Sequence, residues 1–199
     1  MTNCNRLTVE IKYIYREIIV AKILVLYHSD TGRTETMAKF VAQGAAQIPG
    51  HDIRLQSIES ATEDDILWCD ALAVGSPTNL GAVSWKMKKF WDDISINLWG
   101  KIDGKIATVF SASGGYGGGN EMTCLNLLII LMNFGFLVFG VTDYAAPDFS
   151  PHYGAISATN PEGSAEKASC ILLGKRLAEW AATYVDHQSN KHPRFKPVN

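Results

Sequence analysis

Between residues 22 and 186, short β-type runs alternate with longer segments whose apolar residues recur at helical spacing. The short runs occupy residues 23–27, 53–58, 71–75, 106–110 and 136–141. Runs that are apolar throughout, such as residues 71–74, are typical of strands buried on both faces. The alternation predicts an α/β fold, a doubly wound three-layer sandwich around a five-stranded parallel sheet.

The segments between these runs predict the helices. One helix is expected to follow the first strand and to end just before Pro49, and others are expected over residues 63–68, 83–94 and 121–134. A last helix is expected to run to about residue 186, with Asn160 to Glu162 as its cap and first turn. Ser76 and Pro77 are expected to stop the third strand, because the residue before proline is conformationally restricted.

Residues 29–34, which read Ser-Asp-Thr-Gly-Arg-Thr, connect the first strand to the first helix. Their hydroxyls, a glycine that permits close backbone approach, and the free N–H groups of a helix start can together solvate a phosphate dianion. The Walker pattern G-x-x-x-x-G-K-[ST] and the dinucleotide pattern G-x-G-x-x-G do not occur here. The loop therefore predicts a phosphate site that uses no lysine.

Two further loops follow the third and fourth predicted strands, at residues 76–81 and 111–120. In an open α/β sheet, ligands bind beyond the carboxyl ends of the strands, where the strand order reverses. The many glycines of the second of these loops are costly in chain entropy, and they suit a place where a flat ring lies against backbone. A glycine-rich surface loop without a ligand is the alternative.

Composition excludes several classes of function. A net charge of −2 without a run of basic residues argues against nucleic acid as a partner. Cys4, Cys69, Cys124 and Cys170 are widely spaced, which favours buried thiols over disulfides or a zinc site, and no metal is expected. The apolar run at residues 125–132 is too short to cross a membrane, and charged residues interrupt the first 20 positions, so a cytoplasmic protein is expected.

The chain divides into three parts. A folded α/β core is expected over residues 21–187, with an N-terminal extension at 1–20 and a flexible tail at 188–199. Apolar residues alternate between Leu7 and Tyr15, so an added edge strand is the alternative to an extension.

Residues 25–34, continuing to Ala38 and Val41, resemble the flavodoxin signature around the phosphate of FMN. Residues 75–81, the glycine-rich run after Ser111, and residues 152–155 resemble the WrbA-like NAD(P)H:quinone oxidoreductases, a branch of the flavodoxin superfamily. The resemblance covers about residues 22–186 and implies the strand order 2-1-3-4-5. It also implies FMN as cofactor, NAD(P)H as electron donor and a homo-oligomer, either a dimer or a tetramer.

Carried over to this sequence, the resemblance implies three groups of FMN-binding residues. The phosphate group comprises Ser29, Asp30, Thr31, Gly32, Arg33 and Thr34, which would act through side-chain oxygens and backbone amides. One side of the ring would be lined by Pro77, Thr78, Asn79, Leu80 and Gly81, and the other side by Ser111, Ser113, Gly114, Gly115 and Tyr116. The chain departs from the branch in having Asn133-Phe134-Gly135 where a histidine usually precedes His-Gly, and in lacking the long insertion after the second strand.

The function expected first is an FMN-dependent oxidoreductase that takes a hydride from NAD(P)H and reduces a quinone or a similar acceptor. The alternative is a flavodoxin-type electron carrier that docks with redox proteins, although such carriers are usually more acidic than this chain. A phosphoacceptor domain is disfavoured, because Ser76 and Pro77 stand where it needs a carboxylate. No residue is assigned a catalytic role.

Several side chains outside these loops also carry expectations. His28 is interpreted as a strand-end residue, and His152 as a residue that could face a partner or substrate. Trp91 is expected in the core and Trp99 on the substrate side. The lysines at positions 86, 88 and 89 are expected on a solvated helix face.

Overall fold

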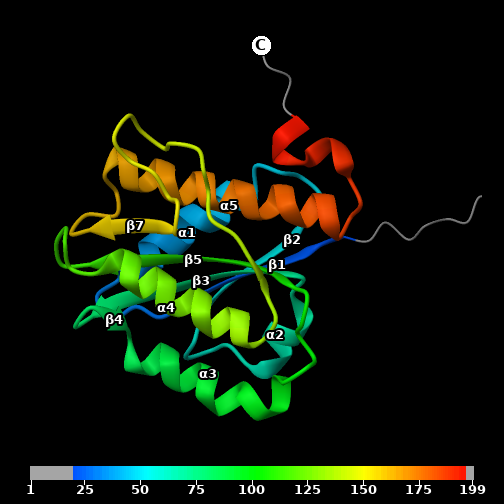
Figure 1. Cartoon of the computed structure of the whole chain (residues 1–199), viewed down its shortest axis with the longest axis horizontal. Coiled ribbons are helices and arrows are strands. Elements are labelled where there is room, and N and C mark those ends of the chain that lie inside the picture. Colours follow the sequence, from blue (N-terminus) through cyan, green and yellow to red (C-terminus); the bar gives the residue numbers. More distant parts are fainter. Residues whose placement is uncertain (1–19, 196–199) are drawn as a thin grey trace, which may run out of the picture.

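A computed structural model describes residues 20–195 (Figure 1). Its strands are β1 (Lys22–Tyr27), β2 (Asp52–Ser57), β3 (Ala71–Asn79), β4 (Ala82–Val83), β5 (Ile106–Ser113), β6 (Leu137–Val138) and β7 (Ala155–Ala158). Its helices are α1 (Arg33–Ala45), α2 (Glu63–Trp68), α3 (Trp85–Leu98), α4 (Asn120–Asn133) and α5 (Ser164–Tyr184). The sheet has the order β2-β1-β3-β5-β6, with β7 also on β5 and the short β4 antiparallel to β3. The predicted α/β fold and its parallel strand order are confirmed.

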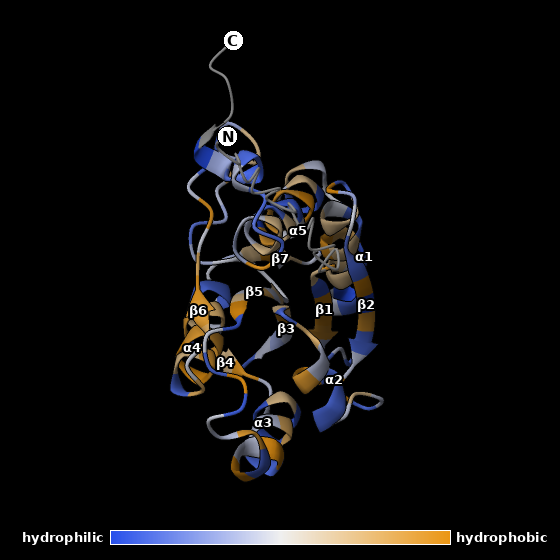
Figure 2. Ribbon diagram, turned by 90° about the vertical axis from the view of Figure 1, so that its right-hand side faces the viewer, coloured by the Kyte–Doolittle hydropathy of each residue, from blue (hydrophilic) through white to orange (hydrophobic). Residues whose placement is uncertain are grey.

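Helices cover both faces of the sheet, with α1 and α5 on one face and α2, α3 and α4 on the other (Figure 2). Alternate residues of β1 enter the two cores: Ile23 and Val25 pack towards α1 and α5, while Leu24 and Leu26 pack towards α2 and α3. All four are fully buried. This two-sided burial explains why the strands are apolar at successive positions.

The prediction of a single fifth strand over residues 136–141 is wrong. Two short strands share that edge of β5 instead: β6 pairs with residues 106–107, and β7 pairs with residues 110–113. Residues 139–154 leave the edge between them and return. The second half was missed because residues 155–158, Ala-Ile-Ser-Ala, carry only a weak apolar signal.

Two predicted boundaries also shift. The third strand does not stop at Gly75, because Ser76 and Pro77 continue the parallel register with Ser111 and Ala112 of β5. The last helix begins at Ser164 instead of at 161–162. The sequence before it forms a turn, in which the Glu162 amide donates to the Asn160 side chain at 3.0 Å.

The helices α1 and α5 approach each other unusually closely. A Cβ atom on Gly174 of α5 would lie 1.9 Å from the carbonyl oxygen of Val41, and one on Gly44 of α1 would lie 2.0 Å from that of Ile171. Both contacts are to backbone, which cannot rotate away. Glycine at these two positions therefore sets the position of α1, whose first turn follows the predicted phosphate loop.

The two ends of the predicted core are joined. The Asp186 carboxylate accepts a hydrogen bond from the Ala21 amide at 2.8 Å, and its other oxygen lies 3.2 Å from Nε2 of buried His51. Beyond α5, residues 188–195 form two 3-10 turns, and the His192 ring packs edge-on against Trp180 with centroids 4.8 Å apart. Whether this predicted tail moves stays a prediction. Residues 1–19 and 196–199, with Cys4 and most of the predicted extension, lie outside the described residues.

Cys69, Cys124 and Cys170 are buried free thiols, as expected. Burial raises the pKa of Cys69 to about 12, and it raises the pKa values of the other two as well. Within residues 20–195, every helix is too short or too polar to span a bilayer.

Candidate functional site

The three predicted loops meet at the carboxyl edge of the sheet around a cavity of about 150 Å³. The residues that line it are Ser29, Asp30, Thr31, Arg33, Thr34, Pro77, Thr78, Asn79, Ala112, Ser113 and Gly114. All except Ala112 belong to the predicted site. Ala112 was missed because a methyl group carries no chemical signal in the sequence.

The first wall of the cavity is the loop between β1 and α1. Gly32 is the N-cap of α1 with φ of 84°, in the left-handed region that favours glycine. It has no side chain to cap the helix, so the first amides of α1 lack a side-chain acceptor. Ser29 Oγ is buried and has no hydrogen-bond partner among the described residues. Together these groups leave unpaired donors at one corner of the cavity.

The second wall, from Ser76 to Gly81, is braced from below by hydroxyl groups. Thr123 of α4 donates to Thr78 at 2.9 Å, and Thr78 pairs with Ser111 at 2.9 Å. Ser111 in turn donates to the Ser76 carbonyl at 2.9 Å. Ser111 is fully buried, so its side chain ties β5 to β3 beneath the cavity and does not line it.

The third wall is the glycine-rich loop between β5 and α4. The Tyr116 hydroxyl donates to Glu166 of α5 at 2.5 Å, which anchors the loop tip to the opposite layer. This hydrogen bond raises the pKa of Tyr116. A Cβ atom on Gly119 would lie 3.0 Å from the Cα atom of Gly81, so the second and third loops touch where neither residue has a side chain. Tyr116, Gly81 and Gly115 do not line the cavity themselves.

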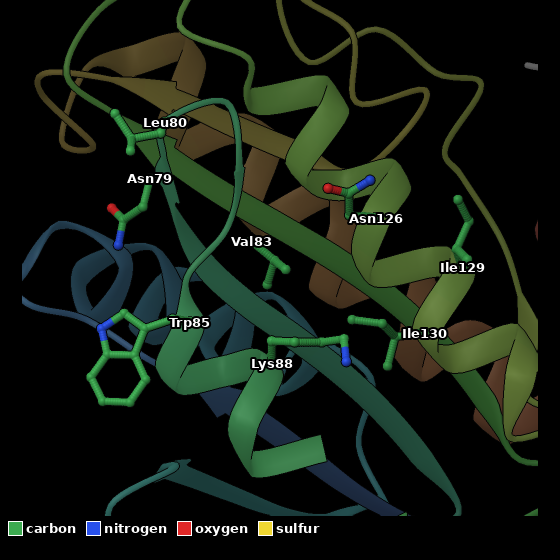
Figure 3. Close-up of a pocket in the computed structure, with 8 residues that line it drawn as sticks. All are labelled: Asn79, Leu80, Val83, Trp85, Lys88, Asn126, Ile129 and Ile130. Carbon is green, nitrogen blue, oxygen red and sulfur yellow. The ribbon is translucent and has the colours of Figure 1, made fainter. Parts of the chain in front are cut away.

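A larger, apolar groove of about 520 Å³ adjoins the cavity and shares Asn79 with it (Figure 3). It lies between the β3–β4 hairpin, α3 and α4, and it is lined by Asn79, Leu80, Val83, Trp85, Lys88, Asn126, Ile129 and Ile130. Leu80, predicted beside the ring, lines this groove instead of the cavity and is fully exposed. The groove could not be read from the sequence, because it requires α3 and α4 to lie side by side.

The positions of Trp91, Trp99 and His152 bear on three further predictions. Trp91 is buried as expected. Trp99 lines neither the cavity nor the groove: it follows the last residue of α3, at the end of that helix away from the β3–β4 hairpin, and its ring packs on Phe134. His152 Nδ1 donates a hydrogen bond to the Val141 carbonyl, 3.1 Å away, and the ring does not line the cavity.

The lysines at the start of α3 are paired with carboxylates. Lys88 and Lys89 pair with Asp92 and Asp93 one helical turn on, which fits the expected solvated face. Lys86 instead pairs with Asp30 of the predicted phosphate loop, with Nζ 2.7 Å from Oδ1. Within residues 20–195, no cluster of three or more His, Cys, Asp or Glu side chains could hold a metal ion.

The family profile described as Flavodoxin matches residues 25–151. The chain belongs to the flavodoxin family. A relative named flavodoxin, from Aquifex aeolicus, is 57% identical over 167 residues, which are 84% of this chain and 90% of that protein. A relative named NAD(P)H dehydrogenase (quinone), from Rhizobium rhizogenes, is 32% identical over 200 residues, which cover 83% of this chain and 100% of that protein.

Solved flavodoxin structures agree with this assignment. The crystal structure of a flavodoxin, WrbA-like protein from Agrobacterium tumefaciens, matches with a TM-score of 0.66 at 27% identity, over 82% of this chain and 99% of that one. The predicted resemblance to flavodoxins, including the WrbA-like branch, is therefore confirmed.

Proposed function

We propose that this flavodoxin-family chain binds FMN at the carboxyl edge of its sheet and carries electrons between redox proteins. The observation that carries the proposal is the unpaired, buried Ser29 hydroxyl beside the uncapped start of α1. A buried donor without a partner costs free energy. A phosphate dianion would satisfy this hydroxyl and the first amides of α1 together.

The residues present fit FMN. The phosphate would be held by Ser29, Thr31, Gly32, Arg33 and Thr34, with Asp30 contributing its backbone. The ring and its ribityl chain would be held by the second and third loops, through Pro77, Thr78, Asn79, Leu80, Gly81, Ser113, Gly114, Gly115 and Tyr116, with Ser111 as a support. When bound, FMN supplies the redox chemistry, and these residues supply position, electrostatics and access.

Two observations favour the carrier over an enzyme. The 57% identical relative from Aquifex aeolicus is named a flavodoxin, whereas the relative named a quinone dehydrogenase is 32% identical. Among the described residues that line the cavity there is no histidine, and the one carboxylate, that of Asp30, is held in an ion pair. Electron transfer to a partner protein needs access to the cofactor but no acid or base in the walls.

An NAD(P)H-dependent quinone reductase is the second candidate, favoured by the apolar groove. Its volume of about 520 Å³ is in the range of small-molecule sites, and Trp85 offers an exposed aromatic face. The donor would be NADH or NADPH, and the acceptor a quinone.

The two candidates are distinguished by anaerobic spectra of the FMN-loaded protein. For the carrier, NADH and NADPH leave the flavin absorbance unchanged until a separate flavoprotein reductase is added. Direct bleaching by either nucleotide, followed by recovery with benzoquinone, would refute the carrier and establish the reductase.

The phosphate cradle itself is tested with Ser29→Ala. Because a hydrogen bond to a charged group contributes about 1.5–3 kcal/mol, FMN affinity should fall at least about tenfold. Riboflavin, which lacks the phosphate, should bind the variant with the same affinity as it binds the wild type. Ser95→Ala is the matched control, because Ser95 lies on α3 outside the cavity and its hydroxyl donates only within its own helix. An equal loss of both flavins in Ser29→Ala would contradict the assignment of Ser29 to the phosphate.

The proposal includes a cellular location and an oligomeric state. A cytoplasmic location fits a small redox carrier, and a dimer or tetramer would cover the exposed apolar side chains of α4, such as Ile129 and Met132. The unit expected to fold and bind FMN is residues 21–187, since Asp186 holds the Ala21 amide.

A further inference from the structure

Asp30 presents a difficulty for the proposed phosphate site. Its carboxylate belongs to the loop that would receive a phosphate dianion, and it lines the same cavity. Like charges at short range repel, so an ionised aspartate here would weaken FMN binding unless its charge is balanced. The contacts of Asp30 supply that balance.

The first contact comes from α3. Lys86 Nζ lies 2.7 Å from Asp30 Oδ1, although the two residues are 56 positions apart. Lys86 stands in the first turn of α3, where the positive end of the helix dipole disfavours a cation and where no acidic residue offsets it. The position of Lys86 is therefore unfavourable for α3 alone and is explained by its partner in the phosphate loop.

The second contact comes from His28, which is 1% exposed. Its Nδ1 lies 2.8 Å from Ser84 Oγ, and that oxygen already accepts from the Met87 amide as the N-cap of α3. The Ser84 hydroxyl can then donate its own proton to Nδ1, which leaves the imidazole proton on Nε2. Nε2 lies 3.3 Å from Asp30 Oδ1 and 3.9 Å from Glu59 Oε1, but it forms no hydrogen bond with either carboxylate.

We infer that Lys86 clamps Asp30, with His28 beside the pair, so that Asp30 acts as a positioning residue of the phosphate loop and its charge is neutralised before a dianion binds. The inference rests on the proposed binding of FMN. The hydrogen bond from Lys86 lowers the pKa of Asp30, and the same bond raises the pKa of Lys86, so both groups are charged at neutral pH. The clamp makes the site selective for the phosphorylated flavin over riboflavin.

The clamp also joins two walls of the cavity. The Ser84 amide donates to Ser76 Oγ at 3.0 Å, and Ser76 begins the loop assigned to the ring. His28 therefore connects the phosphate loop, through Ser84, to the ring-side loop. The cap of α3, the phosphate loop and the ring-side loop share one set of buried contacts.

The test measures FMN and riboflavin affinities separately, by quenching of flavin fluorescence, for Lys86→Met. This variant leaves the Asp30 carboxylate without its ammonium. FMN affinity should fall about tenfold, the size expected from one nearby unbalanced charge facing a dianion in water. Riboflavin affinity should not change. The loss should shrink as salt is added, because screening weakens the repulsion.

Three further variants make the test specific. Lys86→Arg should restore FMN affinity, and Asp30→Asn combined with Lys86→Met should do the same by removing the unbalanced carboxylate. Lys89→Met is the matched control, because it deletes the same charge from the same helix but breaks only the pair with Asp93. Its FMN affinity should equal that of the wild type.

The outcomes separate the clamp from the proposed function. Equal losses of FMN and riboflavin in Lys86→Met, or the same FMN affinity in Lys86→Met as in Lys89→Met, would overturn the clamp while FMN binding stands. A wild-type protein that binds neither flavin would overturn the FMN proposal, and the clamp with it.

Discussion

Replacing Gly174 with alanine tests the close approach of α1 and α5, on which the position of the phosphate loop depends. The new Cβ atom would lie 1.9 Å from the Val41 carbonyl oxygen and 3.0 Å from the Ala45 amide nitrogen. Non-bonded carbon atoms pack at about 3.5 Å, so the two helices would have to separate by roughly 1.5 Å. No side-chain rotation can relieve a clash with backbone.

Two effects of opposite sign decide the magnitude. Alanine is favoured over glycine in a helix interior by about 1 kcal/mol. Overpacking a close-packed core costs about 1–3 kcal/mol, and contact with rigid backbone places this site at the upper end. The free energy of unfolding should therefore fall by about 2 kcal/mol, which lowers the melting temperature by roughly 4–8 °C in a chain of this size.

The assay is urea unfolding followed by far-ultraviolet circular dichroism. Ala168→Gly, on the same helix, calibrates the propensity difference without a clash and should lose about 1 kcal/mol. Gly44→Ala should behave like Gly174→Ala, and the double variant should lose less than the sum, because one separation relieves both clashes. A Gly174→Ala protein as stable as the wild type would refute the described helix contact.

Two further variants probe buried and capping carboxylates. Asp186→Ala should lower the free energy of unfolding, measured in urea, by about 3 kcal/mol, since it leaves the Ala21 amide and His51 without a partner. Asp186→Asn can still accept from Ala21 and should lose less than half as much. Equal losses in the two variants would argue against this contact. Burial raises the pKa of Asp65, but hydrogen bonds from Thr62, Gln56 and Arg54 together outweigh it, so the pKa is lowered in the fold. Its stabilisation is present above the unfolded pKa of about 3.9 and is lost as pH falls through the lower folded value, so Asp65→Asn should lose less stability than the wild type between about pH 5 and pH 2. Parallel pH curves for the two proteins would contradict that assignment.

The local features of the site could be predicted from the sequence because their causes are local. Residues 29–34 carry hydroxyls and a glycine at a strand-to-helix junction, and the structure has Gly32 in the left-handed conformation at that junction. The parallel sheet followed from the alternation of strands and helices, and the strand order followed from the family resemblance. The split of the fifth strand could not be predicted in this way, because residues 155–158 become a strand only by pairing with β5.

The roles of individual residues also depend on contacts between distant segments, which the sequence does not show. That Trp99 lies outside both the cavity and the groove could not be predicted, because an aromatic side chain in a loop does not indicate which end of the sheet it occupies. Ser111 was predicted at the ring, but its hydroxyl is taken up by Ser76 and Thr78 beneath the cavity. Which polar groups remain available for a ligand depends on which ones other segments have already paired.

The sequence by itself determined the layered α/β architecture and the chemistry of the loop after β1, since periodicity and backbone conformation act over a few neighbouring residues. Only the tertiary structure decided that Ser29 keeps a free buried hydroxyl while Asp30, its neighbour, is bound by Lys86. Hydrogen bonds and ion pairs between residues 56 positions apart depend on how helices pack on the sheet, and that packing is not written in any local pattern.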